Sequence, residues 1–374
     1  MSIGLLILGL VLFVLLVVVH EFGHFIMARR NGVDIEEFGI FFPPTLWSRK
    51  TKAGWKFSVN LIPLGGFVKM KGEHDSDTRP HTFGAASLGA KTKIMLAGIV
   101  MNILAAFVLL TILCWVGLPQ LVNNQFTIKS DTKIIKNEVL IGAVLKNSPA
   151  QKAGLVDGDQ LLEIISSVGK VVEITSADLL PNTTKQFAGQ TVKVEYVQNK
   201  QIKIKQITFL NNSIVNASLK TNDHKGYLGI SPAQYILQRS TWSAPVTAAG
   251  LLAQITALTF KGLATAVVGL LQGNTAKATA QVAGPVGIFE LLKTGSLLGY
   301  QFVLMIVAVI SLSLAIMNVL PIPALDGGRL FITLITKAIH KTLSESAESI
   351  IYGAGFAFLI LLVILITIVD VRRS

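Results

Sequence analysis

The sequence predicts a polytopic α-helical membrane protein that carries one soluble module between its helices. Of the 374 residues, 51% are hydrophobic and only 14% are charged, a balance typical of membrane proteins. Several apolar runs reach the length of about 20 residues that crosses the hydrocarbon core of a bilayer. A long polar stretch, rich in Lys, Asn and Thr, separates the second of these runs from the third.

Four apolar runs predict four transmembrane helices, at residues 1–28, 94–118, 300–326 and 350–370. The first run has no basic segment before it and no small-residue cleavage site after it, so we interpret it as a retained helix rather than a signal peptide. The single cysteine, Cys114, lies inside the second run, which excludes an intramolecular disulfide.

The charges of the loops predict the orientation of these helices. The loop 29–93 carries eleven Lys and Arg but only six Asp and Glu, so the positive-inside rule places it, and with it the loop 327–349, in the cytoplasm. Arg372 and Arg373 fit this orientation poorly. The net charge of +12 does not indicate nucleic-acid binding, because no nucleic-acid motif accompanies it and the basic residues lie mostly in loops.

Three segments outside the spans have distinct characters. Residues 54–72 contain short β-prone runs around Pro63, which predict a membrane-associated β-hairpin on the cytoplasmic side. Residues 119–240 contain strand-like runs and predict an extracytoplasmic α+β domain. Residues 241–299 predict amphipathic helices lying at the membrane surface, since Lys261 would otherwise fall near the middle of the bilayer.

The end of the first apolar run contains the pentapeptide HEFGH, residues 20–24. His20 and His24 are four residues apart and share one face of a helix. This H-E-x-x-H spacing lets two imidazoles bind one zinc ion, with Glu21 beside them as general base. The alternative is a pair of polar residues that hydrogen-bond across helices, as buried polar groups in membrane helices often do. The glutamate between them favours a metal site.

Asp326 is the predicted third ligand, because a catalytic zinc site takes three protein ligands and keeps one position open. It is the only acidic residue in or bordering the third span. The alternative is that Asp326 caps a helix starting near Gly327. If the first and third spans both run inward, the ligands lie at one depth, whereas a further span at 246–272 would place Asp326 on the opposite side.

These motifs resemble the site-2 protease family of intramembrane zinc metalloproteases, particularly the bacterial enzymes of regulated intramembrane proteolysis. The match rests on HEFGH and on the pattern N-x-x-P-x-P-x-L-D-G at 318–327. The segments PLGGFVKMKGE, residues 63–73, and AGPVGI, residues 283–288, are similar to the family as well. The second span reads AGIVMN, with Ile99 where family members often have proline.

The resemblance implies a role for each matching position. It implies one catalytic Zn²⁺ bound by His20, His24 and Asp326, with Glu21 as the catalytic base. It implies that the remaining motif residues contact the substrate, namely Asn318, Gly65, Gly66 and Phe67. The substrates implied are single-span membrane proteins, such as shortened anti-sigma factors or remnant signal peptides, and the location implied is the bacterial inner (cytoplasmic) membrane.

The extracytoplasmic module resembles a PDZ domain through SPAQKAGLVDGDQLLEI, residues 148–164, and KGYLGI, residues 225–230. Either this module binds peptide C-termini, or it acts as a steric filter over the entrance. Two rival functions stay open at this stage: a membrane PDZ adaptor without catalysis, and a metal-ion transporter. The transporter is disfavoured because no second chain of intramembrane carboxylates is evident.

Overall fold

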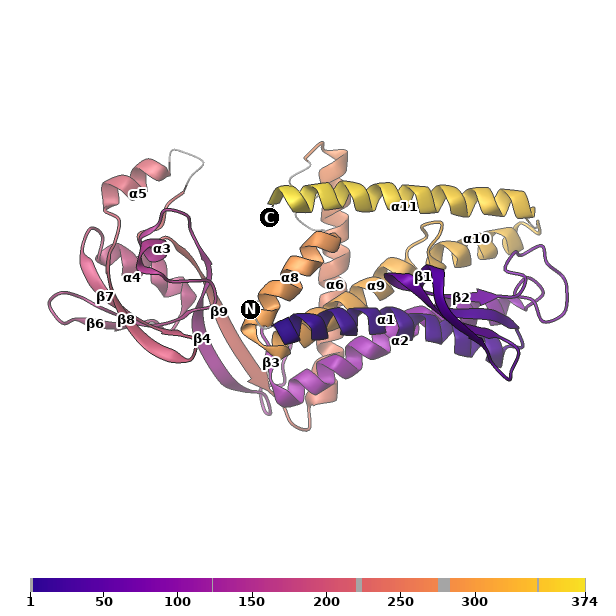
Figure 1. Cartoon of the computed structure of the whole chain (residues 1–374), viewed down its shortest axis with the longest axis horizontal. Coiled ribbons are helices and arrows are strands. Elements are labelled where there is room, and N and C mark those ends of the chain that lie inside the picture. The colour runs from indigo at the N-terminus through magenta and orange to yellow at the C-terminus, as the bar shows by residue number, and fades with distance from the viewer. Residues whose placement is uncertain (1–2, 123, 220–223, 275–282, 342, 374) are drawn as a thin grey trace. The chain divides into compact units, whose positions relative to one another are not determined.

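The computed structural model describes residues 3–122, 124–219, 224–274, 283–341 and 343–373. The chain divides into two compact units (Figure 1). We call Met1–Cys114 with Trp242–Ser374 the helical unit, and Trp115–Thr241 the sheet unit. The polar module predicted from the sequence thus coincides with a separate unit inserted between helices.

Among the described residues, five helices are long and apolar enough to cross a membrane: α1 (Ile3–Arg30), α2 (Leu88–Val116), α6 (Ala244–Leu271), α9 (Tyr300–Val319) and α11 (Glu345–Arg373). Helices suit a bilayer because they satisfy their backbone hydrogen bonds internally. Many of their apolar side chains are exposed, among them Val11, Val108 and Leu365. Such broad apolar surface fits lipid contact and a multi-pass membrane protein.

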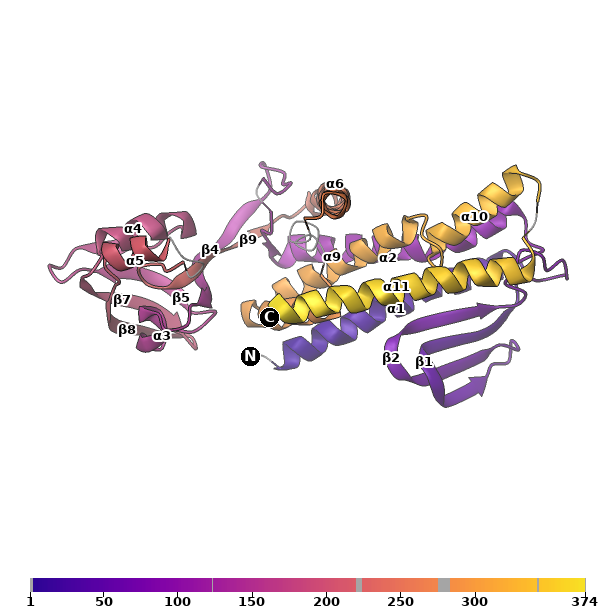
Figure 2. The ribbon, with the colours of Figure 1, turned by 90° about the horizontal axis from the view of Figure 1, so that it is seen from above.

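The helix α6 is the one long apolar helix that the sequence prediction placed at the membrane surface. Its length and composition also allow a span, so this criterion does not decide between four and five crossings. In Figures 1 and 2, however, α6 runs crosswise to α1, α2, α9 and α11. The described part of this region also contains the helix α8 (Pro285–Leu298). Its first turn receives the carboxylate of Asp370 from α11, which accepts hydrogen bonds from the backbone N–H groups of Gly284 and Gly287.

The predicted hairpin is a larger sheet than the sequence suggested. Strands β1 (Ile35–Lys50) and β2 (Lys56–Met70) are antiparallel, and both bend. The first half of β1 pairs on one side with residues 66–70 and on the other with residues 56–59. The runs flanking Pro63 are therefore both strands, as predicted, but a strand from residues 35–40 separates them. The sequence prediction missed that strand, because the run IEEFGI, with two adjacent glutamates and a glycine, does not alternate strictly between apolar and polar residues.

The third predicted span ends earlier than expected. Helix α9 stops at Val319, and the chain is extended at Leu320. Pro321 and Pro323 explain the break, since proline lacks the N–H that a helix interior needs. The predicted loop 327–349 contains most of a new helix, α10 (Asp326–Ala338). The loop prediction is wrong for these residues, because α10 is a short but strongly amphipathic helix. Only the capping alternative for Asp326 places a helix start near Gly327.

The sheet unit contains a seven-stranded sheet in the order β3-β9-β4-β5-β7-β8, with β6 beside β5. Its strands are β3 (Leu118–Pro119), β4 (Lys133–Val144), β5 (Gln160–Ile165), β6 (Val171–Glu173), β7 (Thr191–Gln198), β8 (Gln201–Thr208) and β9 (Ile230–Arg239). The helices are α3 (Pro149–Ala153), α4 (Leu180–Gln186) and α5 (Asn212–Ser218), with a 3₁₀ turn at Ala177–Leu179.

The helix, turn and strand predicted within residues 148–164 are all present. Ser148 caps α3 by accepting a hydrogen bond from the backbone N–H of Gln151, as N-cap serines do. Gly154 ends the helix in a left-handed conformation with φ 83°, which glycine adopts without strain. The strand β5 follows at Gln160.

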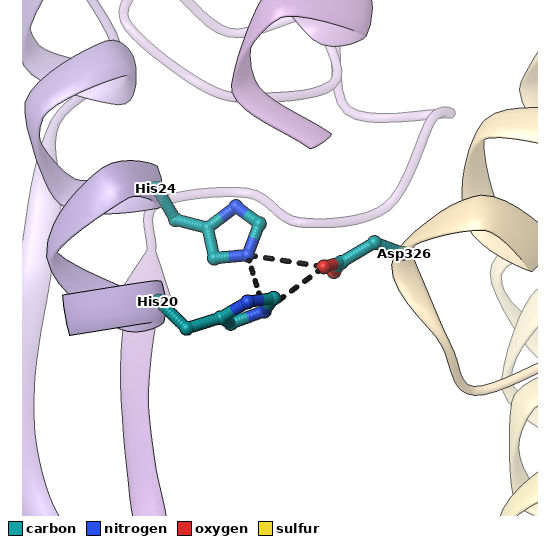
Figure 3. Close-up of side chains that lie close together, drawn as sticks. All are labelled: His20, His24 and Asp326. Atoms are coloured by element: carbon teal, nitrogen blue, oxygen red, sulfur yellow. Dashed lines mark hydrogen bonds and ion pairs between the residues drawn. The ribbon is translucent and has the colours of Figure 1, made fainter. Parts of the chain in front are cut away.

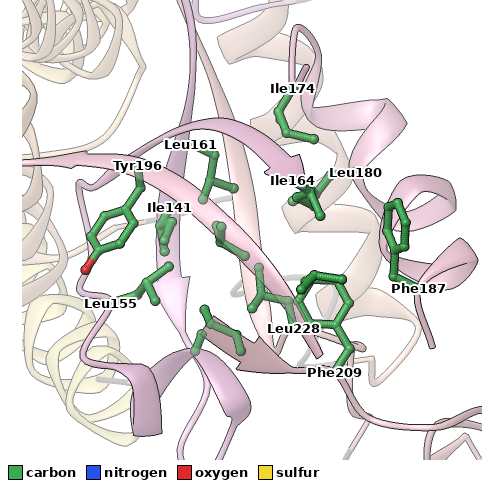
Figure 4. Packing of buried hydrophobic residues seen from close by; sticks show 14 of the residues in the cluster. Ile141, Leu155, Leu161, Ile164, Ile174, Leu180, Phe187, Tyr196, Phe209 and Leu228 are labelled. Atoms are coloured by element: carbon green, nitrogen blue, oxygen red, sulfur yellow. The ribbon is translucent and has the colours of Figure 1, made fainter. Parts of the chain in front are cut away.

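The sheet unit has its own hydrophobic core (Figure 4). Side chains from the inner face of the strands, including Ile141, Ile164 and Tyr196, are almost fully buried against Leu180 and Phe209. A core contained within one unit predicts that the unit folds independently.

We therefore expect residues 115–241, produced alone, to fold as a soluble domain. Ile164→Ala should lower its free energy of unfolding by roughly 2–5 kcal/mol, because the substitution removes buried methyl groups and leaves a cavity. Ile202→Ala, at a position that is 65% exposed on the same sheet, is the matched control and should change stability little. Chemical denaturation followed by circular dichroism measures both; equal effects would contradict the assigned core.

Candidate metal centre

Three metal-ligand side chains meet in the helical unit (Figure 3). His20 and His24 project from one face of α1, and Asp326 projects toward them from the first turn of α10. The Nε2 atoms of the two histidines are 3.1 Å apart. Oδ2 of Asp326 lies 3.1 Å from Nε2 of His20 and 3.2 Å from Nε2 of His24. The sequence predicted this meeting of residues more than 300 positions apart, and the structure brings them together.

The triangle formed by these atoms fits a zinc ion. In a tetrahedral site with bonds of about 2.0–2.1 Å, neighbouring ligand atoms are roughly 3.3–3.4 Å apart. The observed edges of 3.1–3.2 Å are close to that separation. Three protein ligands on one side leave the fourth position open, as in catalytic zinc sites. Two imidazoles and one carboxylate are also a donor set that suits zinc.

The hydrogen bond at Nδ1 of His24 determines which ring nitrogen, Nε2, has a lone pair available for a metal. Nδ1 of His24 lies 2.8 Å from the backbone carbonyl oxygen of Ile94. A carbonyl only accepts, so Nδ1 carries the hydrogen, and Nε2 of the neutral ring offers a lone pair. Oδ2 of Asp326 is likewise buried without a hydrogen-bond partner in the described part of the chain. Acceptor atoms facing one another in this way need a cation between them.

Asn102 of α2 contacts the other histidine, His20. Its amide lies 3.2 Å from Nδ1 of His20, and its Oδ1 is buried with no hydrogen-bond partner among the described residues. Rotating the amide by half a turn places Oδ1 on the Nδ1–H of His20, which leaves Nε2 free for the metal. The sequence alone gives Asn102 no role beyond its place in AGIVMN. An amide inside an otherwise apolar span was the signal that could have identified it.

The helix α2 packs directly against the two histidines at Gly98, a position without a side chain. A Cβ added at Gly98 would lie 2.6 Å from Nε2 of His20, and closer still to Nε2 of His24. A Cβ at Gly23 would lie 2.6 Å from the carbonyl oxygen of Ala97. The two helices therefore approach so closely that only hydrogen fits at these positions. Any larger group at Gly98 would fill the space beside the coordinating nitrogens.

The end of helix α9 at Val319 and the start of α10 determine where Asp326 lies. Cβ atoms at Gly327 and Gly328 would overlap the backbone at Asn318 and Ile322, so the start of α10 lies directly on the chain that follows α9. Residue Leu325, rather than Asp326, is the N-cap of α10, and no side-chain capping bond is present. The alternative interpretation, that Asp326 caps a helix, is therefore correct about where the helix begins but wrong about the role of the side chain. The carboxylate of Asp326 points toward the histidines (Figure 3).

Glu21 lies between the metal ligands and the sheet. Its carboxylate accepts a hydrogen bond from the backbone of Val68, and a Cβ added at Gly66 would lie 3.4 Å from Cγ of Glu21. Gly65 is buried in the same bend, near Phe42 and Val17. Phe67 stacks on Phe42, with ring centroids 6.4 Å apart. Of the three predicted β-loop residues, Gly66 therefore lies beside Glu21, and Gly65 and Phe67 adjoin Gly66 in the chain.

Asn318 lies in the last turn of α9 and is half-buried. Its backbone carbonyl contacts the start of α10, since a Cβ at Gly327 would lie 2.7 Å from it. The structure thus places Asn318 close in space to the residue that follows Asp326. Its predicted role in substrate binding stays a prediction.

Comparison with known proteins agrees with this site. The sequence matches peptidase family M50 over residues 8–362. A protein of Clostridium acetobutylicum named "Putative zinc metalloprotease" is 31% identical over 373 residues, which cover 99% of this chain and 98% of that one. A protein of the same description from Clostridium perfringens is 29% identical, with 97% of each chain covered. "Probable protease eep" of Enterococcus faecalis is 24% identical over 97% of this chain and 98% of its own.

Three candidate metal-ligand side chains among long apolar helices, together with the family match, place the chain in the class of membrane metalloproteases. The protein belongs to peptidase family M50, the site-2 protease family. It is a zinc metalloprotease.

Substitution of Gly98 tests whether α2 shapes the metal centre. Gly98→Ala should strongly reduce the zinc content of the purified protein, because the added methyl group overlaps the coordinating nitrogens. Gly89→Ala, on the same helix where nothing lies within 4 Å of an added Cβ, is the matched control and should retain zinc. Metal analysis of both proteins measures this, and full zinc in Gly98→Ala would contradict the geometry described above.

Proposed function

We propose that this protein is an intramembrane zinc endopeptidase that cleaves transmembrane segments of single-span membrane proteins. One observation carries the proposal: the ligand atoms of His20, His24 and Asp326 converge within 3.2 Å inside a set of long apolar helices. Ionisable side chains are costly in the hydrocarbon region and mark functional sites there. The family assignment supports peptide hydrolysis as that function.

The residues of the site divide the chemistry among them. His20, His24 and Asp326 would hold one zinc ion, which supplies Lewis-acid chemistry by making a water acidic near neutral pH and polarising a carbonyl. Glu21 stands next to this position and takes the proton from the attacking water as general base. Glu21 then returns that proton to the nitrogen of the scissile peptide bond as it leaves. Asn318, near the start of α10, is proposed to contact the substrate.

The sheet of β1 and β2 offers a way to hold an unwound substrate. A helical substrate hides its peptide carbonyls in hydrogen bonds, so it must unwind before attack. Residues 66–70 pair with one strand only among the described strand pairs. Their other side faces Glu21, through Val68 and Gly66. A substrate strand added at this side would regain its lost hydrogen bonds beside the catalytic base, with Gly65, Gly66 and Phe67 in contact with it.

The topology that we propose has four spans, α1, α2, α9 and α11, with α6 and α8 at the extracytoplasmic surface. The crosswise direction of α6 supports it (Figures 1 and 2), as does Lys261, which would be costly at mid-membrane. The β1–β2 sheet would then be cytoplasmic, and the sheet unit extracytoplasmic. The loop charges favour this orientation in a bacterial inner membrane.

The sheet unit is proposed to be PDZ-like and to act on the extracytoplasmic side. Its capped helix α3 packs against the segment that precedes β9, through the hydrogen bond from Ala150 N–H to the carbonyl of Leu228. Backbone amides near Gly229 would suit a peptide carboxylate. The alternative is a steric filter that admits only substrates already shortened outside the membrane. Anti-sigma factors and remnant signal peptides are the substrate types that fit either role.

The substitution Glu21→Gln separates catalysis from metal binding. We expect the variant to retain zinc and to lose cleavage of a model single-span substrate by at least about 100-fold, as removal of a general base does. Asp326→Asn is the matched comparison: it exchanges a carboxylate for an amide of the same size and should lose zinc as well as activity. Metal analysis and gel-based cleavage in vesicles give both readouts.

This pair of variants also distinguishes the rival functions. An adaptor would be indifferent to Glu21→Gln but sensitive to loss of the sheet unit, and a transporter would show zinc flux into vesicles. Cleavage retained by Glu21→Gln would refute the role of Glu21.

The position of the carboxyl terminus tests the number of spans. Four crossings place both ends of the chain outside the cytoplasm, whereas a crossing by α6 would move the carboxyl terminus inside. A reporter active only in the periplasm or outside the cell, fused after α11, should therefore be active. A fusion within the loop after α10 is the opposite control and should be inactive. An inactive α11 fusion would show that α6 spans the membrane.

A further inference from the structure

A groove between α1 and α2 is not used by the proposed reaction. Its cavity measures about 430 Å³, and almost all of its lining is apolar. The side walls are formed by Ile26 and Met27 on α1 and by Leu96, Val100 and Met101 on α2. Val100 is 49% exposed, so the groove opens outward from the helix pair rather than into the metal centre.

At the end of the groove that lies toward Gly23 and Met101, α1 and α2 are in close contact. A Cβ added at Gly23 would lie 2.6 Å from the carbonyl oxygen of Ala97 and 2.8 Å from Cγ of Met101. Gly98, the residue that follows Ala97, lies against the Nε2 atoms of His20 and His24. The lining of the groove therefore includes the residue of α2 that directly precedes the one in contact with the histidines.

Two cations stand at the other end of the groove, Arg30 and Lys93. Arg30 is in the last turn of α1, and Lys93 is in the second turn of α2. Both side chains are exposed, and neither has an ion pair in the described part of the chain. At 1.5 Å per residue, they lie roughly 6–10 Å along the helices from the Gly23–Ala97 contact. An apolar slot therefore ends at two unpaired positive charges near the ends of two long apolar helices.

We propose that this groove binds one anionic phospholipid, with an acyl chain along the slot and the phosphate between Arg30 and Lys93. Charge complementarity favours a lipid with net negative charge, because zwitterionic headgroups bring their own cation to the same place. The apolar lining excludes a soluble phosphate compound as the main occupant, since such a compound gains nothing from the slot. The bound chain fills the space behind Gly23 and supports the contact of α2 with the metal centre.

The experiment uses the full-length protein purified in detergent. Dioleoylphosphatidylglycerol is titrated in and bound lipid is counted by native mass spectrometry, with dioleoylphosphatidylcholine as the zwitterionic lipid of identical chains. Arg30→Gln/Lys93→Gln is expected to weaken phosphatidylglycerol binding by roughly 10- to 30-fold, since each cation near the headgroup contributes about one factor of five. Phosphatidylcholine binding should barely change.

Two further variants make the result specific. Lys337→Gln/Lys341→Gln removes the same charge from two exposed lysines at the end of α10 that lie outside this groove, and it should leave binding unchanged. Val100→Trp fills the slot and should reduce phosphatidylglycerol binding while both cations remain. Glycerol phosphate alone should not compete with the lipid.

Several outcomes would overturn the proposal. Equal loss of binding in the α10 pair would show that the protein senses net charge only. Effective competition by glycerol phosphate would show a site for free phosphate compounds. Unchanged lipid binding in Val100→Trp, together with reduced substrate cleavage, would show that the groove receives the substrate helix. None of these outcomes depends on whether Glu21 is the catalytic base, so the proposed function is tested separately.

Discussion

Three acceptor atoms that face one another inside apolar helices are the constraint on which the rest of the helical unit depends. Nε2 of His20, Nε2 of His24 and Oδ2 of Asp326 form a triangle with edges of 3.1–3.2 Å. Without a cation, the buried carboxylate would carry a large desolvation cost. With zinc, the same atoms become ligands, and the remaining ring nitrogens determine which lone pairs are available. The hydrogen bonds from His24 to Ile94 and between His20 and Asn102 serve this purpose.

Close packing of backbones positions these atoms. Gly23 and Gly98 allow α1 and α2 to approach until a single methyl group would not fit between them. Gly327 and Gly328 allow α10 to begin directly on the chain that leaves α9. In a bilayer, where lipid tails are as apolar as leucine, close packing of small residues is a main source of helix association. The glycines thus set both the stability of the helix contacts and the geometry of the site.

The β1–β2 sheet lies against Glu21, next to the candidate metal centre. It places Gly66 and the backbone of Val68 against Glu21. The same bend is lined by the stacked rings of Phe42 and Phe67. Glu21 and this strand edge are therefore fixed relative to each other, which is what the proposed hydrolysis of an unwound segment requires. Glu21 is not among the residues that line the groove between α1 and α2, and the assignment of that groove to lipid rests on its apolar lining and on Arg30 and Lys93.

The sequence by itself determined the class of the protein and predicted the three candidate ligands, because both depend on local patterns: long apolar runs, the i, i+4 spacing of His20 and His24, and the lone Asp326 in the third run. It also predicted strand-like runs in the sheet unit and the helix α3 with the strand β5, where capping residues and alternation are regular. Only the tertiary structure decided what depends on contacts between distant segments. It showed the strand 35–40 between the two halves of β2, the helix α10, the role of Asn102 and the close approach of Gly98 to the imidazoles. These features arise from packing, and no local period in the sequence records which backbones will touch.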